Sequence, residues 1–222
     1  ALRDVTLNIK AGESVALVGP VGAGKSTLLL SLLGETPHSA GYVSISTDSP
    51  EQRSRIAYVS QEPYIRNASV RENILFGCDE KNVDERLATA IQVSCLETDL
   101  ASLPAGLQTE IGERGVNLSG GQKMRVCIAR AVMKHAGIVL LDDPLAAVDV
   151  HTERSLVNDL LFGVWHSATR IVATHRLTHL HRFDTVVYME NGRVLGSGSL
   201  HSLIETCEEF REFYAQHNDN DV

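Results

Sequence analysis

The sequence has 222 residues, which is long enough for one large domain with a substantial core. Apolar residues make up 43% of it and charged residues 22%, and its formal net charge of -8 argues against a basic module that holds nucleic-acid backbones. It has no apolar run of the roughly 18 residues that a membrane-spanning helix needs, and its four cysteines lack the CxxC spacing of a metal site.

Predicted strands and helices alternate from the start of the chain. Residues 2–10 alternate between apolar and polar side chains, which predicts a half-buried strand. The apolar run Ser14–Val18 leads into a glycine-rich turn, and Lys25–Leu33 has its apolar residues at helical spacing. Two more strands are predicted at Gly41–Ser46 and Ile56–Ser60.

From about residue 69 to residue 134 the pattern becomes mostly helical. Val83–Leu96 and Gly121–Lys134 have helical periodicity, and a glycine-rich link at Ile111–Gly121 separates them. This segment predicts a helical insertion into the surrounding domain.

Strand patterns return after residue 135. They lie at Ile138–Asp142, Arg170–Thr174, Thr185–Met189 and Arg193–Ser197. Asn191-Gly192 is a strong hairpin signal between the last two, and Leu200–Ala215 is expected to form one or two helices. We therefore expect an α/β fold with a mostly parallel sheet. Residues 1–222 would form a single domain, with residues 1–68 and 135–222 as the α/β core, an antiparallel β portion near the N-terminus, and residues 69–134 as a helical subdomain.

Residues Gly19–Ser26 read GPVGAGKS and fit the pattern GxxxxGK[ST] between a predicted strand and a predicted helix. Glycines let backbone N–H groups turn inward around phosphate oxygens, and the helix N-terminus adds its positive dipole end. Lys25 can reach the β- and γ-phosphates, and the Ser26 hydroxyl can bind Mg²⁺. The residues expected to bind nucleotide here are Gly19, Gly22, Gly24, Lys25, Ser26 and Thr27.

The run IVLLD at Ile138–Asp142 is typical of a buried parallel strand that ends in a carboxylate. Ligands of open α/β sheets bind at the carboxyl ends of the strands. Asp142 is therefore predicted to position Mg²⁺ beside the phosphates.

The segment LSGGQ at Leu118–Gln122 places a serine and two glycines at the start of a predicted helix, which suits a second phosphate-binding element. Its candidate nucleotide-binding residues are Ser119, Gly121 and Gln122. The segment matches the ABC signature motif, and with the other motifs the chain resembles ABC transporter nucleotide-binding domains, with their P-loop NTPase core, over nearly its whole length.

The resemblance assigns further residues. It implies that Gln61 lies in the Q-loop, which touches Mg²⁺ and the transmembrane coupling element, that residues 146–149 form the D-loop, and that His175 is the switch histidine. The expected catalytic residues are Asp143, His175 and Gln61, and the expected Mg²⁺ ligands are Ser26, Gln61 and Asp142.

Segments 69–77 and 109–115 resemble exporter-type sequences, and the chain is most similar to the first nucleotide-binding domain of the multidrug-resistance-associated subfamily, subfamily C. The family normally has glutamate after the Walker B aspartate, but Asp143 is one methylene shorter, so a slow, degenerate site is expected. In the family, an aromatic residue upstream of the first strand stacks on adenine, and this chain starts beyond that point, so weak Mg-ATP binding is expected. Weak ATPase activity is expected in isolation, because an isolated cassette lacks the half of the site that its partner supplies.

The resemblance also implies partners. These are a second cassette in the same polypeptide and transmembrane domains, with ATP and Mg²⁺ as cofactors and no other metal or nucleic acid. By itself the chain is expected to be soluble, and in the whole protein to lie on the cytoplasmic face of a membrane. Two alternatives stay open: a regulatory, ATP-sensing cassette of a channel or channel regulator, and a soluble ABC ATPase that acts on nucleic acid.

Overall fold

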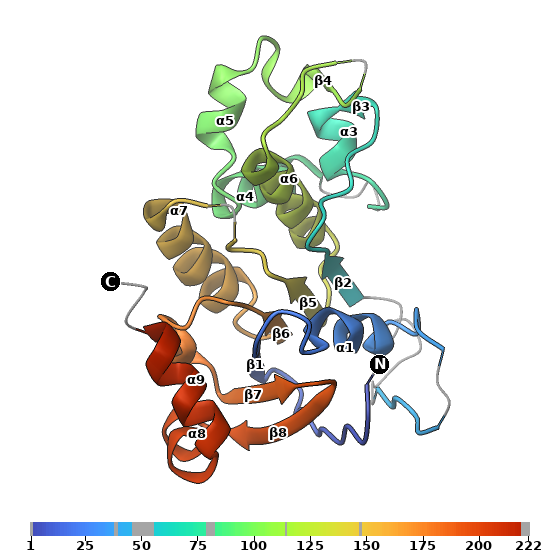
Figure 1. Cartoon of the computed structure of the whole chain (residues 1–222). Coiled ribbons are helices and arrows are strands. Elements are labelled where there is room, and N and C mark those ends of the chain that lie inside the picture. The colour runs from blue at the N-terminus through green and yellow to red at the C-terminus, as the bar shows by residue number, and fades with distance from the viewer. Residues whose placement is uncertain are drawn as a thin grey trace. The chain divides into compact units, whose positions relative to one another are not determined.

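The computed structural model describes residues 2–37, 40–45, 56–78, 83–113, 115–146 and 148–218 (Figure 1). The chain divides into two compact units, which we call the sheet unit and the helical unit. The sheet unit comprises Ala1–Ile56, Gly137–Ala146 and Ser167–Val222. The helical unit comprises Ala57–Ala136 and Ala147–His166, so it contains the segment 69–134 that the sequence marks as helical.

A six-stranded sheet has the strand order β2-β5-β6-β1-β7-β8. Its strands are β1 (Ser14–Val18), β2 (Ile56–Val59), β5 (Ile138–Asp142), β6 (Thr169–Ala173), β7 (Thr185–Glu190) and β8 (Arg193–Gly198). Strands β5, β6, β1 and β7 are parallel to their neighbours in this set, and β8 pairs with β7 in the antiparallel direction. All five residues of β1 are buried, as expected of a central parallel strand.

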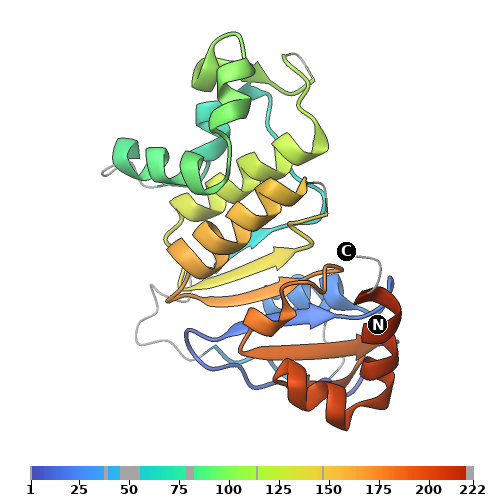
Figure 2. The same ribbon diagram turned by 90° about the vertical axis from the view of Figure 1, so that its left-hand side faces the viewer.

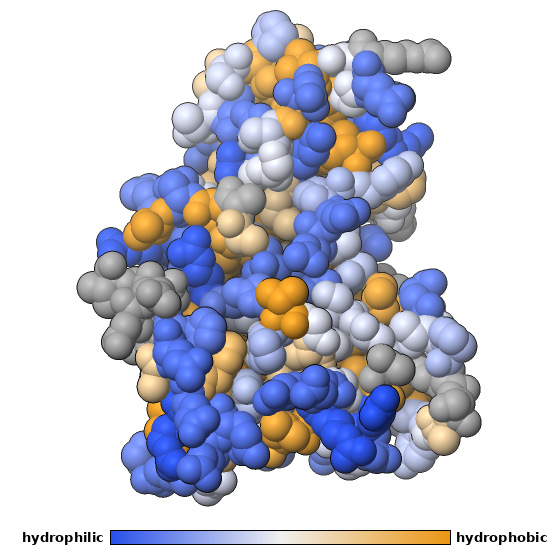
Figure 3. Space-filling view, in the orientation of Figure 1, coloured by the Kyte–Doolittle hydropathy of each residue, from blue (hydrophilic) through white to orange (hydrophobic). Residues whose placement is uncertain are grey.

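Among its described residues, the sheet unit has the helical segments α1 (Lys25–Leu32), η3 (Leu180–Arg182), α8 (Leu200–Thr206) and α9 (Glu208–Asn218). Helix α1 contacts β5 and β6, and α8 contacts β7 and β8 (Figure 2). The buried ring of Phe210 on α9 lies 5.6 Å from the Tyr188 ring on β7, measured between centroids. Hydrophilic residues dominate the outer surface over α8 and α9 (Figure 3). The two helices are therefore amphipathic, with an apolar face towards the sheet and a polar face outside.

The helical unit is built around α6 (Gly120–Met133), which contacts α3 (Val70–Ile74) and α4 (Val83–Val93). Its other elements are α5 (Glu97–Ser102), η1 (Gly106–Gln108), α7 (Val150–Ser155), the π-helical segment η2 (Leu156–Val164), and the antiparallel pair β3 (Ala68–Ser69) and β4 (Glu110–Ile111). Arg130 on α6 donates to the Asn73 carbonyl at 2.7 Å, which ties α6 to α3.

The predicted α/β fold with a mostly parallel sheet is confirmed. Strands at 14–18, 56–60, 138–142, 170–174, 185–189 and 193–197 and helices at 25–33, 83–96 and 121–134 occur within a few residues of their predicted bounds. The expected C-terminal helical segment is present as the two helices α8 and α9.

The two local strand predictions near the N-terminus are wrong for the residues that the structure describes, although a separate antiparallel pair is present at β3 and β4. Residues 2–10 and 41–45 form no strand, and Ser46 lies outside the described residues. The alternation along 2–10 does appear as alternating exposure from Val5 onward. Arg3 N donates to Gly192 O at 2.8 Å, which ties this stretch to the turn between β7 and β8 without forming a ladder.

The sequence analysis missed the helix that α7 and η2 form. Buried Leu156, Val157, Leu160 and Leu161 stand at helical spacing there and could have revealed it. Among the described residues, no helix combines the length and apolarity that crossing a membrane requires.

Candidate functional site

The glycine-rich loop between β1 and α1 has a backbone that only glycine accommodates. Gly19 has φ +146°, and a Cβ atom there would lie 2.0 Å from the Met189 carbonyl oxygen. Gly24 caps the first turn of α1 in the left-handed conformation (φ 104°) and makes no side-chain cap hydrogen bond there. That turn also has no acidic residue, so its N–H groups and dipole suit an anion.

The turn between β7 and β8 supports this loop. Gly192 N donates to Ala23 O at 2.9 Å, and a Cβ on Gly24 would lie 3.4 Å from the Gly192 Cα atom. The left-handed φ angles of Asn191 (51°) and Gly192 (78°) are those of a tight hairpin turn. The shape of the loop therefore depends on a turn that is distant in sequence.

Lys25 lies over the loop. Its side chain is buried, and its Nζ atom donates to the carbonyl oxygens of Gly19 (2.7 Å) and Pro20 (3.1 Å). An ammonium has three N–H donors, so these two bonds leave one for a phosphate oxygen. Burial lowers the pKa of Lys25, and the carboxylates of Asp143 and Asp142 oppose that shift.

Asp142 stands at the carboxyl end of β5 and is 4% exposed. Burial raises the pKa of its carboxyl group, while a hydrogen bond from the Ser26 side chain lowers it. The structure thus joins the two groups that were predicted to bind Mg²⁺. Since Mg²⁺ prefers oxygen ligands, a hydroxyl beside a buried carboxylate fits this ion.

Asp143 follows Asp142 with a left-handed backbone (φ 51°), and its N–H donates to Ala173 O at 2.9 Å. Its side-chain Oδ1 atom is buried and has no hydrogen-bond partner. A buried carboxylate oxygen without a donor is costly, and such groups gather at functional sites. A cation or an ordered water would satisfy it, which again fits a Mg²⁺–phosphate site.

His175 follows β6 and is exposed. Partial burial lowers its pKa, and the positive charge of Lys25 acts in the same direction, whereas Asp143 and Asp142 raise it. These four side chains therefore share one electrostatic environment at the carboxyl ends of parallel strands in the sheet unit.

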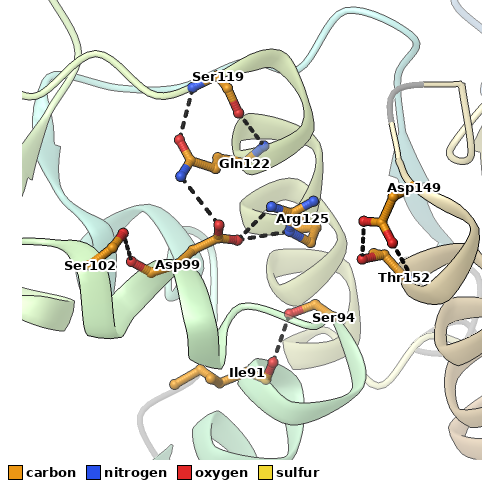
Figure 4. Close-up of polar contacts among 9 residues, drawn as sticks. All are labelled: Ile91, Ser94, Asp99, Ser102, Ser119, Gln122, Arg125, Asp149 and Thr152. Carbon is orange, nitrogen blue, oxygen red and sulfur yellow. Dashed lines mark hydrogen bonds and ion pairs between the residues drawn. The ribbon is translucent and has the colours of Figure 1, made fainter.

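Ser119 in the helical unit caps α6 (Figure 4). Its Oγ atom accepts from Gln122 N at 3.2 Å, and Ser119 N donates to Gln122 Oε1 at 2.9 Å, which completes a capping box. The second polar atom of the Gln122 side chain, Nε2, donates to Asp99. The Gln122 side chain is therefore engaged inside the protein, while Ser119 and the first residue of α6, Gly120, are exposed.

The remaining predicted residues are placed as follows. Gln61 is exposed just after β2, Thr27 is half-buried in the first turn of α1, and Gly121 is half-buried in the first turn of α6. Asp149 of the predicted D-loop caps α7, where it accepts from the N–H groups of His151 and Thr152. Residue 147 of that loop lies outside the described residues.

Residues 2–146 match the model of the family described as "ABC transporter". The chain belongs to the ABC transporter family. ABC domains bind ATP, and this ABC chain has a glycine-rich loop directly before α1.

Several C-family proteins are similar to this ABC chain. It is 43% identical to "ABC transporter C family member 8" of Dictyostelium discoideum, over 95% of the chain and 13% of that protein. It is 40% identical to "ATP-binding cassette sub-family C member 2" of Homo sapiens, over 94% of the chain and 13% of that protein. "ABC-type transporter cicA" of Emericella nidulans is 43% identical, over 95% of the chain and 14% of that protein.

The fold is that of a solved ABC exporter cassette. The chain superimposes with a TM-score of 0.87 and 31% identity on the "Structure of a bacterial Atm1-family ABC exporter with ATP bound", over 97% of the chain and 38% of that one. The ABC chain thus spans only about an eighth to a seventh of the curated relatives just named.

Proposed function

We propose that this chain is the first ATP-binding cassette of an exporter-type ABC transporter of subfamily C. It would bind Mg-ATP at the cytoplasmic face of a membrane, pair with a second cassette of the same polypeptide, and couple ATP binding and hydrolysis to transmembrane domains. The observation that carries the proposal is the shared environment of Lys25, Asp142, Asp143 and His175 at the carboxyl ends of parallel strands. The similarity to C-family transporters supports it.

The residues of the sheet unit would bind this chain's own nucleotide. The N–H groups of the loop from Gly19 to Gly24, with Lys25, would bind the phosphates. Ser26 and Asp142, aided by Gln61 after β2, would hold Mg²⁺, which neutralises phosphate charge when bound. His175 has a lowered pKa and is therefore mostly neutral at pH 7, so it can donate or accept a hydrogen bond at the γ-phosphate.

Asp143 would orient the attacking water, and it would do so poorly. Its carboxylate is one methylene shorter than the glutamate of competent sites, and general-base assistance depends on hydrogen-bond reach. We therefore propose that the site in the sheet unit binds ATP but turns it over slowly.

The signature residues would act on the nucleotide of the second cassette. Ser119 and Gly121, with Gln122 shaping the cap, would present the α6 N-terminus to the phosphates bound there. Both units would then serve as one ATPase domain, with residues 1–68 and 135–222 as its core and residues 69–134 as the signature-bearing subdomain.

A substitution in the signature motif tests this division of labour. In the intact transporter, Ser119→Phe should depress ATP turnover while ATP binding to this chain's own loop stays nearly unchanged. Lys25→Ala is the matched control, because it should weaken binding to this chain directly. Loss of nucleotide binding by this chain in the Ser119 variant, with the fold retained, would contradict the assignment.

A second candidate function is a regulatory cassette that senses ATP and gates a channel or modulates a partner. The short carboxylate of Asp143 favours it, since a slow site suits a sensor. Movement of solute against a gradient by the full protein would support the exporter, and passive conductance would support the sensor. ATPase stimulation by RNA or DNA would instead favour a soluble ABC ATPase, against which the net charge of -8 argues.

A further inference from the structure

The N-terminus of α6 is held in place by a chain of polar contacts that starts on α5 (Figure 4). Asp99 on α5 accepts from Gln122 Nε2 at 3.2 Å through Oδ1. Its other oxygen, Oδ2, accepts from Arg125 Nε at 2.8 Å and lies 2.7 Å from Arg125 Nη2. The side chains of Arg125 and Asp99 are only 13% and 15% exposed, so this ion pair is better shielded from water and salt than a surface pair.

These contacts determine which way the Gln122 amide faces. Gln122 Oε1 accepts from Ser119 N at 2.9 Å, and its Nε2 atom donates to Asp99. If the amide were flipped, Oε1 would face the Asp99 carboxylate and Nε2 would face a backbone N–H, so both bonds would be lost. Asp99 therefore fixes the orientation of the amide that completes the cap at Ser119.

The ion pair between Asp99 and Arg125 also neutralises a negative charge near the N-terminus of α6. A lone carboxylate near the N-terminus of α6 would oppose an anion that binds there, and the first turn of α6 has no acidic residue. Arg125 neutralises Asp99 through two donors on one oxygen, which leaves the second oxygen for Gln122. The pair thus supplies a rigid acceptor without net negative charge.

We propose that Asp99 is a positioning residue for the signature motif: through Gln122 it holds Ser119 and the first amides of α6 in the geometry that engages the nucleotide of the second cassette. The inference rests on the proposed function, since it takes from it the role of the signature in trans. In this proposal Asp99 acts through Gln122 and not by contact with nucleotide. Because a misplacement of about 1 Å can cost 10²-fold in a positioned reaction, its loss should lower turnover by about tenfold.

Two double variants separate positioning from mere stability. Asp99→Leu with Arg125→Met removes both charges and leaves Gln122 Nε2 without an acceptor, while apolar replacement of an ion pair is often neutral for stability. Asp99→Asn with Arg125→Met also removes both charges, but an asparagine oxygen can still accept from Gln122. Ser102→Ala is the control on the same helix, because Ser102 Oγ donates only to the Asp99 backbone carbonyl, at 2.7 Å.

The assay is steady-state ATP turnover of the intact transporter, with kcat and KM resolved and thermal unfolding measured alongside. We expect the Leu/Met variant to lose about tenfold in kcat at an unchanged unfolding temperature. The Asn/Met variant should recover most of that loss, and Ser102→Ala should match the unchanged protein. Equal kcat in the Leu/Met and Asn/Met variants would overturn the proposal.

A further variant serves if the Leu/Met variant fails to fold. Asp99→Ala with Arg125→Met then replaces it, because it also removes both charges and the acceptor of Gln122 Nε2. Turnover of the Ala/Met variant equal to that of the Asn/Met variant would then refute the role of Asp99. If Ser119→Phe leaves ATP turnover unchanged, the role assigned to the signature motif in the proposed function is refuted, and the contacts of Asp99 are not what is at fault.

Discussion

The substitution Asp143→Glu should make the site in the sheet unit faster and the fold slightly weaker. The added methylene advances the carboxylate by about 1.5 Å, and a 1 Å error can cost about 10²-fold, so a gain of at least tenfold in hydrolysis is expected. The loss of folding stability comes from the backbone conformation at residue 143. Asp143 has φ 51°, a conformation that aspartate tolerates better than glutamate, and the left-handed region costs roughly 1–2 kcal/mol for ordinary residues. A loss of about 1 kcal/mol corresponds to about 2–4 °C in unfolding temperature for a domain of this size.

Single-turnover hydrolysis in an assembled transporter whose second site has been silenced measures the gain. Asp143→Asn is the matched control, because asparagine keeps the length and tolerates the same φ but cannot act as a base. It should gain nothing in rate and lose little stability. A rate for Asp143→Glu equal to that of the unchanged protein would show that something other than the reach of this carboxylate limits the site.

Two other substitutions test the local physics of the fold. Both Gly19→Ala and Gly22→Ala place a side chain at positive φ, which costs about 1–3 kcal/mol. Gly19→Ala would also place a Cβ 2.0 Å from the Met189 carbonyl oxygen, whereas a Cβ at Gly22 would meet no described non-neighbouring atom within 4 Å. Urea unfolding should therefore find Gly19→Ala the more destabilising by about 1–3 kcal/mol; equal effects would show that the loop adjusts freely. Hydrogen bonds from Thr152, first from its side chain and then from its backbone N–H, lower the pKa of Asp149 to about 2. Its stabilising effect should be complete above about pH 4 and fade as the pH falls from the unfolded-state pKa of 3.8 towards 2. Asp149→Ala should accordingly lower the unfolding temperature at pH 7 but make little difference at pH 2. If the difference in unfolding temperature between the variant and the unchanged protein were the same at both pH values, the stabilising role of the Asp149 cap would be contradicted.

The elements that the sequence predicted well are those with strong local signals. The run Ser14–Val18 is apolar, ends at a glycine turn, and forms β1 with the same bounds. The stretch 2–10 has an equally regular alternation but forms no strand, because a ladder requires a partner that local pattern cannot supply. Alternation therefore predicted which side chains would be half-buried and failed to predict backbone pairing.

In the site, too, local sequence patterns could be predicted and contacts between distant segments could not. Its motifs could be located in the sequence because each is a short run with its own spacing. Lys25, Asp142 and His175 lie close enough to shift one another's pKa, because parallel strands share one carboxyl edge. Asp99 has no motif of its own, since its contacts with Gln122 and Arg125 join α5 to α6 and local sequence does not predict them.

The dependence of the glycine-rich loop on Gly192 has a consequence for synthesis on the ribosome. The loop emerges early, but the turn that donates to Ala23 emerges roughly 170 residues later, which at about 5–20 residues per second is a delay of roughly ten to thirty seconds. Strands β6 and β7, the neighbours of β1, also arrive only in the last third of the chain. During that interval the nascent loop lacks the contacts that shape it. The loop can therefore take its folded shape only once most of this chain has been made.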